Sequence, residues 1–208
     1  MEKAYQYLKV NILNGQLRPS QKVIETELSE QIGVSRNTIK KALLKLEQEN
    51  LITMEKNKGA YVTSFTLQQV LNYLEIREEL EVLVAKHALV NIGPNIEHLH
   101  KYLLNMKVFV KESKLDEYSK MNKAFHQIIY DASNKPEAVD MITVIKTQLQ
   151  RHDFRTILVP GRIQSSLEEH QNIYEALKNK DEAMLEKNLR LHLSQIRDTI
   201  NQNYNLFV

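Results

Sequence analysis

The sequence predicts a mainly α-helical protein, with an N-terminal winged helix-turn-helix in residues 1–64 and a C-terminal antiparallel six-helix bundle in residues 65–208. Short helical segments and a hairpin pattern fill residues 26–63, and no alternating strand pattern appears after them. The charge changes at the same place. Residues 1–64 hold ten Lys and Arg against seven Asp and Glu, whereas residues 65–208 hold 18 against 19. These observations favour two domains, the first with a basic excess.

The first domain begins with a helical pattern from Ala4 to Asn14, followed by a loop that leads to Val23 and Ile24. A second, short helix is predicted from Glu27 to Gln31, and Gly33 supplies the tight turn after it. A third helix is predicted to follow this turn and would complete a three-helix unit.

The third helix should begin after Ser35, because serine is a preferred N-cap residue. Ile39, Leu43 and Leu46 recur at helical spacing, so their face is expected to pack inward. The opposite face stays free to contact DNA, and it carries polar and basic side chains: Arg36, Asn37, Thr38 and Lys40.

A hairpin is predicted behind this helix. The segments LITMEK and AYVTS read as two short strands, joined by Asn57, Lys58 and Gly59. Turn residues of this kind tolerate positive φ. The hairpin would form the wing.

The remaining chain reads as helix. Pro160-Gly161 ends one segment, Ser165 with Glu168 has capping-box spacing, and Asp181 suits the start of the last helix. The pattern predicts six helices, at residues 66–91, 95–112, 116–133, 136–159, 165–179 and 181–204.

Composition excludes several classes of protein. The absence of cysteine excludes disulfides, iron–sulfur clusters and thiolate metal sites. No apolar run approaches the ~20 residues of a membrane span, and the first residues do not resemble a signal peptide. We therefore expect a soluble, cytoplasmic protein without a membrane partner, in which His, carboxylate or amide groups hold any metal.

Three of the seven histidines stand where the helical pattern calls for an apolar residue. His192 interrupts an apolar stripe in the last helix, and His170 and His126 lie on the apolar faces of two others. Asn122 precedes His126 by one turn and shares its face. Neutral imidazoles suit divalent transition metals, so these four residues form a candidate zinc or nickel site.

Three core histidines with separate hydrogen-bond partners are the alternative, because an unpartnered buried polar ring costs about 1–3 kcal/mol. The other histidines are interpreted as structural or solvated: His87, His98, His100 and His152.

The segment GVSRNTIKKALLKLEQENLI followed by NKGAYV is similar to a pattern of the GntR superfamily of bacterial transcription regulators. The whole chain resembles the branch of that superfamily with an all-helical FCD effector domain, in its shorter, VanR-like six-helix form. The resemblance implies that DNA is contacted by residues of the helix-turn-helix and the wing: Thr26, Ser35, Arg36, Asn37, Thr38, Lys40, Lys58 and Gly59.

The reading helix departs from the family pattern at several positions. Thr38 replaces the usual proline, Lys40 the usual arginine and Lys41 the usual glutamate. Lysine is a flexible point charge and lacks the planar fork that matches guanine. Lys40 should therefore favour phosphate contact over base readout, and the operator sequence does not carry over.

The family's metal pattern is an Asp four residues before a His, with two further His on the last two helices. His126, His170 and His192 match this pattern, while Asn122 stands where the family has aspartate. An amide oxygen is a weaker metal ligand than a carboxylate. Since the family metal helps to hold a small carboxylate effector, our hypothesis is that a bound acid supplies the missing negative charge.

Three arginines are candidates for binding that acid. Arg77 matches the arginine that opens the family's first effector helix, and Arg151 and Arg155 lie in the polar run RHDFR. The predicted protein is a homodimeric repressor that binds a short DNA palindrome and responds to a small organic acid. The alternatives are a metal-dependent enzyme, against which no general base is evident beside the histidines, and an effector-less helical scaffold with a degenerate metal site.

Overall fold

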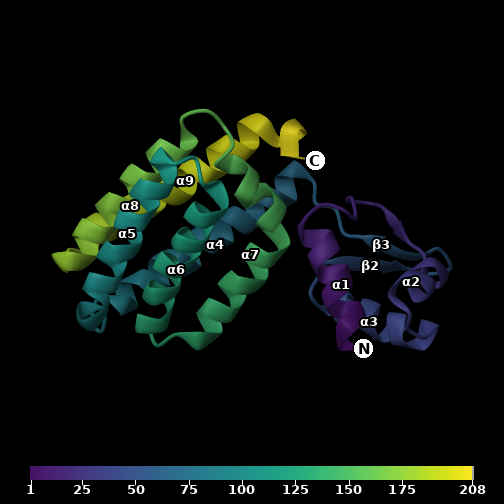
Figure 1. Cartoon of the computed structure of the whole chain (residues 1–208). Helices are drawn as coiled ribbons and strands as arrows, with labels where there is room; N and C mark the ends of the chain where they lie inside the picture. Colours follow the sequence, from purple (N-terminus) through teal and green to yellow (C-terminus); the bar gives the residue numbers. More distant parts are fainter. Residues whose placement is uncertain (208) are drawn as a thin grey trace.

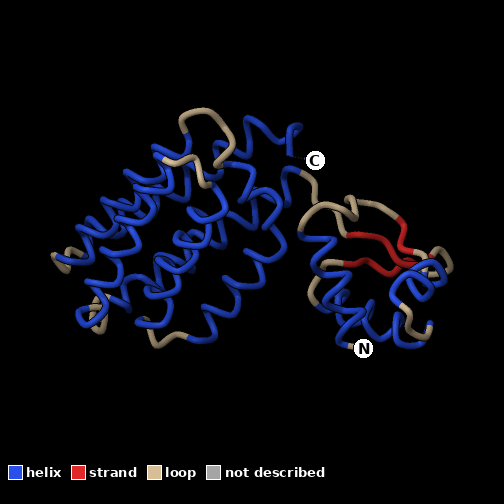
Figure 2. The backbone as a smooth tube through the Cα atoms, viewed as in Figure 1, coloured by secondary structure: helices blue, strands red, loops and turns tan. Residues whose placement is uncertain are grey.

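A computed structural model describes the backbone of residues 1–207 and the side chains of residues 1–150 and 156–204. A small unit of helices and strands at the N-terminus is joined to a larger, all-helical unit (Figure 1). Strands lie only in the smaller unit of this described part (Figure 2). The mainly α-helical fold predicted from the sequence is confirmed.

The N-terminal unit has three helices and a three-stranded antiparallel sheet. The sheet order is β1-β3-β2, with Lys22 of β1 paired to Tyr61 of β3 and Ile52 of β2 paired to Val62. The elements are α1 (Glu2–Leu13), β1 (Lys22–Val23), α2 (Glu25–Ile32), α3 (Arg36–Gln48), β2 (Ile52–Glu55) and β3 (Gly59–Val62).

Strand β1 corrects the prediction of a loop around Val23 and of a two-stranded wing. Two residues are too few to give an alternating pattern, so sequence periodicity does not reveal such a strand. Helix α2 also begins earlier than predicted, at Glu25.

Helix α3 forms as its sequence predicts. The Ser35 side chain accepts a hydrogen bond from the backbone N–H of Thr38 over 3.2 Å, and Gly33 takes a left-handed φ of 72° in the preceding turn. Ile39, Leu43 and Leu46 are buried in the core against α1 and the sheet, which confirms the inward face.

Between Leu67 and Phe207 the chain forms six α-helices, with a short 3-10 helix η1 (Gly93–Asn95) after the first. The fifth of them begins at Arg162, so the capping-box interpretation of Ser165 is wrong, and its hydroxyl instead donates to the carbonyl of Gly161. Asp181 does cap the last helix through the N–H of Met184, at 2.9 Å. The helices are α4 (Leu67–Ala88), α5 (Ile96–Lys111), α6 (Leu115–Ala132), α7 (Pro136–Thr156), α8 (Arg162–Lys178) and α9 (Glu182–Phe207).

Helix α4 packs against α6, α7 and α9, while α8 packs against α5 and α9. Side chains from several helices therefore meet inside the bundle. At the junction of the two units, the Tyr204 hydroxyl of α9 donates to the carbonyl of Phe65, just ahead of α4. Among the described residues, no helix is long and apolar enough to span a bilayer.

Candidate functional site

The outer face of α3 presents the residues predicted to contact DNA. Ser35, Arg36, Asn37 and Lys40 are exposed, whereas Thr38 is half-buried and its hydroxyl lies 2.9 Å from that of Ser35. Since the opposite face is packed in the core, one side of the helix is free for a ligand.

The other predicted DNA contacts flank this helix. Thr26 is half-buried in α2, and Lys58 and Gly59 are exposed at the turn between β2 and β3. Lys58 forms an ion pair with Glu55 at 3.0 Å, and Gly59 has a φ of 103° that favours glycine. The turn also exposes Lys56, so the wing presents two basic side chains at its tip.

Inside the bundle, α6, α8 and α9 bring His126, His170 and His192 together. All three are buried, as the sequence predicted, and one ring nitrogen from each lies within 4.8 Å of the others. The Nε2 atoms of His126 and His170 are 3.1 Å apart. Ring nitrogens this close can bind a single ion, which three separately satisfied histidines could not do.

Partners on the far side of two rings fix their orientation. Nδ1 of His170 lies 2.5 Å from the carbonyl oxygen of Ser166, and Nδ1 of His192 lies 2.6 Å from Oε2 of Glu169. Each acceptor requires the proton on Nδ1, which leaves the lone pair on Nε2. Metal-binding histidines are commonly held in this way.

The environment keeps these imidazoles uncharged. Burial, and after it the nearby His192, lower the pKa of His170 to about 3. The pKa of His192 is also about 3, because of burial and then the nearby Arg162, and that of His126 lies well below its usual range, chiefly through burial. Neutral rings at pH 7 are competent metal ligands.

Asn122 supplies an acceptor on the same helix face as His126. Its Oδ1 atom is buried and has no hydrogen-bond partner. A buried acceptor without a donor costs free energy, which a bound cation or a donor group would recover. The donor set of three imidazoles and one amide oxygen thus fits a divalent transition metal.

Two buried carboxylates flank the cluster, where sequence analysis found no general base. Nε of Arg77 donates to Oε1 of Glu81 over 2.6 Å, and Oε2 of Glu81 lies 3.8 Å from Nδ1 of His126. Burial alone would raise the pKa of Glu81, but attraction by Arg77 and Lys146 lowers it overall. The four-residue spacing of Arg77 and Glu81 is a helical ion-pair signal that could have revealed this contact.

The second carboxylate, Glu169, immediately precedes His170 on α8. It accepts from Nη2 of Arg162 at 3.0 Å as well as from His192, and burial raises its pKa despite the charge of Arg162. Sequence reasoning missed Arg162 and Glu169. Their seven-residue spacing places them two helical turns apart, but it does not show that both are buried.

Of the three arginines predicted to bind the acid, the structure describes the side chain of only one. Arg77 is buried in its ion pair with Glu81. The side chains of Arg151 and Arg155 lie outside the described residues, as does that of His152. The remaining histidines are away from the cluster: His87 and His98 are exposed, and His100 is half-buried and stacks on Tyr174.

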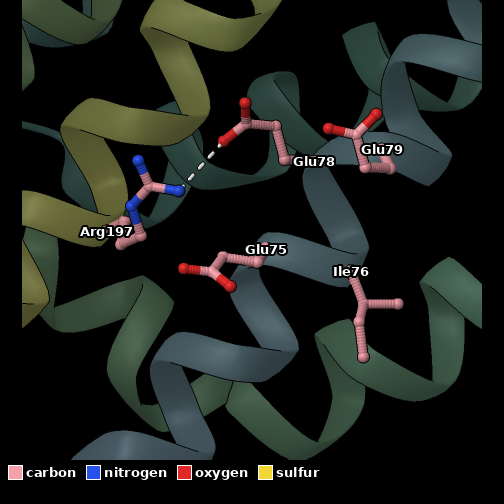
Figure 3. A pocket seen from close by; sticks show the side chains of 5 residues that line it. All are labelled: Glu75, Ile76, Glu78, Glu79 and Arg197. Atoms are coloured by element: carbon pink, nitrogen blue, oxygen red, sulfur yellow. Dashed lines mark hydrogen bonds and ion pairs between the residues drawn. The ribbon is translucent and has the colours of Figure 1, made fainter.

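A separate open pocket lies on the outside of the bundle (Figure 3). Glu75, Ile76, Glu78 and Glu79 of α4 line it together with Arg197 of α9, whose guanidinium is 3.3 Å from Glu78. This pocket shares no residue with the histidine cluster.

Each of the two units matches the model of a known protein family. Residues 1–62 match the model for bacterial regulatory proteins of the gntR family, and residues 72–195 match the model for the FCD domain. The chain belongs to the GntR family and carries an FCD domain. The curated relatives described below are named transcriptional repressors, and this chain is a transcription regulator of the GntR/FCD type.

This GntR-family regulator is similar along most of its length to several curated proteins. It is 25% identical over 202 residues to the HTH-type transcriptional repressor RspR of Escherichia coli, covering 97% of this chain and 89% of RspR. It is 26% identical to the gluconate operon transcriptional repressor of Bacillus subtilis, covering 93% and 82%.

The fold of the regulator also matches solved structures. Escherichia coli McbR/YncC superposes with a TM-score of 0.79 at 24% identity, over 98% of each chain. A GntR regulator from Rhodococcus sp. RHA1 superposes with a TM-score of 0.74 at 17% identity, also over 98% of each chain. These likenesses establish the shared fold.

Proposed function

We propose that this regulator represses transcription as a homodimer on a short DNA palindrome, and that a small organic acid bound beside a divalent metal changes its affinity for DNA. The observation that carries the proposal is the convergence of three neutral imidazoles. The unpartnered Oδ1 of Asn122, one helical turn before His126, supports it. The domain boundary proposed from the sequence, at residues 64 and 65, separates this sensor from the DNA-reading unit.

The proposed ligands are all uncharged: Asn122, His126, His170 and His192. A divalent ion would therefore keep both of its positive charges inside the bundle, where the low dielectric strengthens its attraction for anions. When bound, the metal supplies positive charge and coordination positions for an acid oxygen. The protein's own part is to hold the rings in orientation through Ser166 and Glu169.

The proposed DNA contacts are those of α3 and the wing. Arg36, Asn37 and Lys40 are exposed on a helix whose other face is fixed in the core. One such unit reads few bases, so a two-fold dimer on a palindrome would double the contacts. Repression is the proposed direction because RspR and the gluconate operon protein, both similar to this chain, are named repressors.

Two measurements test the proposal. DNA selected from a random pool by the purified protein should contain a palindrome, and Arg36→Ala should weaken its binding by roughly 10-fold to 100-fold, the loss of one good base contact. Zinc or nickel should bind to chelator-treated protein, and an organic acid should then change the DNA affinity. Equal binding of all DNA sequences by both proteins, or no uptake of metal, would contradict the proposal.

A further inference from the structure

Arg162 is a buried arginine with unused hydrogen-bond donors. Its side chain is about 7% exposed at the first turn of α8, and Nη2 donates to Oε2 of Glu169 over 3.0 Å. The Nε and Nη1 atoms are buried without any hydrogen-bond partner. A guanidinium carries five N–H donors, and donors left unsatisfied in the interior oppose folding unless a ligand or water accepts from them.

The position of Arg162 connects it to the histidine cluster. The oxygen of Glu169 that accepts from Arg162 also contacts Nδ1 of His192, at 2.6 Å. Arg162 thus stands behind one of the three rings, with a single carboxylate oxygen between them. An anion bound to Arg162 would therefore be separated from the proposed metal ligand His192 only by Glu169.

Arg77, the other described buried arginine, has a different role. Its Nε is occupied by Glu81 at 2.6 Å, and the other oxygen of Glu81 lies 3.8 Å from Nδ1 of His126. Arg162 shares its one carboxylate with His192 and keeps two nitrogens unpartnered. Of the two, Arg162 is the better placed to accept an additional anionic group.

We infer that Arg162 binds the carboxylate of the effector, through the N–H groups of Nε and Nη1, while Glu169 holds the guanidinium beside His192. This inference rests on the proposed function, because it assigns a residue to the acid of that same site. It also links the acid to the metal: the anion and Glu169 share one guanidinium, and Glu169 orients His192.

A matched pair of variants isolates Arg162. Its removal alone would leave Glu169 buried without a counter-charge, so the test compares Glu169→Gln, which keeps the arginine, with Arg162→Gln/Glu169→Gln, which removes both charges together. Arg190→Gln serves as the control, since Arg190 also binds several carboxylates but on the outside of the bundle.

The measurement is calorimetric titration of acetate, succinate and citrate into each protein saturated with zinc. Both variants lack the carboxylate that orients His192, so Glu169→Gln is the reference against which binding of the three acids is compared. The double variant should bind them roughly 10-fold to 100-fold more weakly, the effect of losing charge-assisted hydrogen bonds. In wild-type protein, the Nε–H signal of Arg162 in a 15N NMR spectrum should shift when acid is added.

Equal acid affinity in the two variants, with an unmoved Nε–H signal, would overturn the assignment of Arg162 and leave the proposed function standing. Failure of zinc-loaded wild-type protein to bind any of the three acids would remove the proposed effector site, and the assignment with it.

Discussion

Nδ1 of His192 and Oε2 of Glu169 are 2.6 Å apart in the interior of the bundle. The contact joins α9 to α8 and sets the tautomer of the imidazole, because a carboxylate at this distance holds the proton on Nδ1. The lone pair is then on Nε2, and His192 has a ring nitrogen within 4.8 Å of one from each of the other two rings.

Glu169→Gln should weaken zinc binding. The amide is a weaker acceptor than the carboxylate, so it holds the tautomer and orientation of His192 less firmly, and losses of this kind are typically roughly 10-fold to 100-fold. Competition against a chromophoric chelator measures the affinity. Glu168→Gln, at the exposed neighbouring position, should leave it unchanged. An unaltered affinity in Glu169→Gln would show that the contact does not orient a ligand.

Asn122→Asp should strengthen zinc binding by about 10-fold or more, because a carboxylate oxygen replaces a neutral amide oxygen next to a divalent ion. The same change should reduce the gain in zinc affinity produced by added acid, since the negative charge is already supplied. Asn201→Asp, at an exposed position of α9, is the control for added charge. A weaker affinity in Asn122→Asp would place this side chain outside the metal site.

Metal-free protein should lose stability in acid. The pKa of His170 is about 3 in the folded protein against 6.5 when unperturbed, so the unfolded chain takes up the proton first as the pH falls below 6.5. At pH 5 this lowers the free energy of unfolding by about 2 kcal/mol for each such histidine, relative to pH 8. The loss continues down to about pH 3, where the folded protein also becomes protonated.

Urea unfolding at pH 8 and pH 5, in the presence of chelator, measures this difference. His170→Gln should reduce the loss between the two pH values by about 2 kcal/mol, whereas His98→Gln, at an exposed position, should not alter it. An unchanged pH dependence in His170→Gln would mean that His170 is not held neutral by its surroundings.

Lys40→Ala should weaken binding to all DNA sequences to a similar degree. Lysine acts as a point charge on phosphate, so its loss should lower the slope of log affinity against log salt by about one. Fluorescence anisotropy across a salt series gives the slope. Lys101→Ala, on the helical unit, should leave it unchanged. A loss confined to particular base pairs would instead indicate that Lys40 reads sequence.

The features predicted correctly from the sequence are those with a local signal. Helical periodicity located the buried face of α3 and the inward positions of the three histidines, and the Ser35 cap follows from one residue type at a helix start. Strand β1 lacked such a signal because it is two residues long. Ser165 gave a false signal, since α8 starts a turn earlier.

The polar partners of the histidines could not be predicted in the same way. Glu81 lies in the acidic run REELE, and Glu169 follows another glutamate, so both read as solvated residues. Their burial depends on which helices meet. The spacing of Arg77 and Glu81 signals an ion pair within one helix, but neither this spacing nor that of Arg162 and Glu169 shows that the pair is buried. A single sequence therefore does not reveal that such an ion pair is buried.

Helix α9 carries His192 in the bundle and Tyr204 at the boundary with the N-terminal unit, about 18 Å apart at 1.5 Å per residue, with a kink at Asn203. Between them, Ile196 and Ile200 pack beside Val70 and Leu74 at the start of α4. A helix moves largely as a rod, so a sub-ångström shift of His192 along this axis would pull on the carbonyl of Phe65 through the Tyr204 hydroxyl. Through this contact, a displacement that begins at the imidazoles would reach the segment between Val62 and Leu67, which joins the two units of the chain.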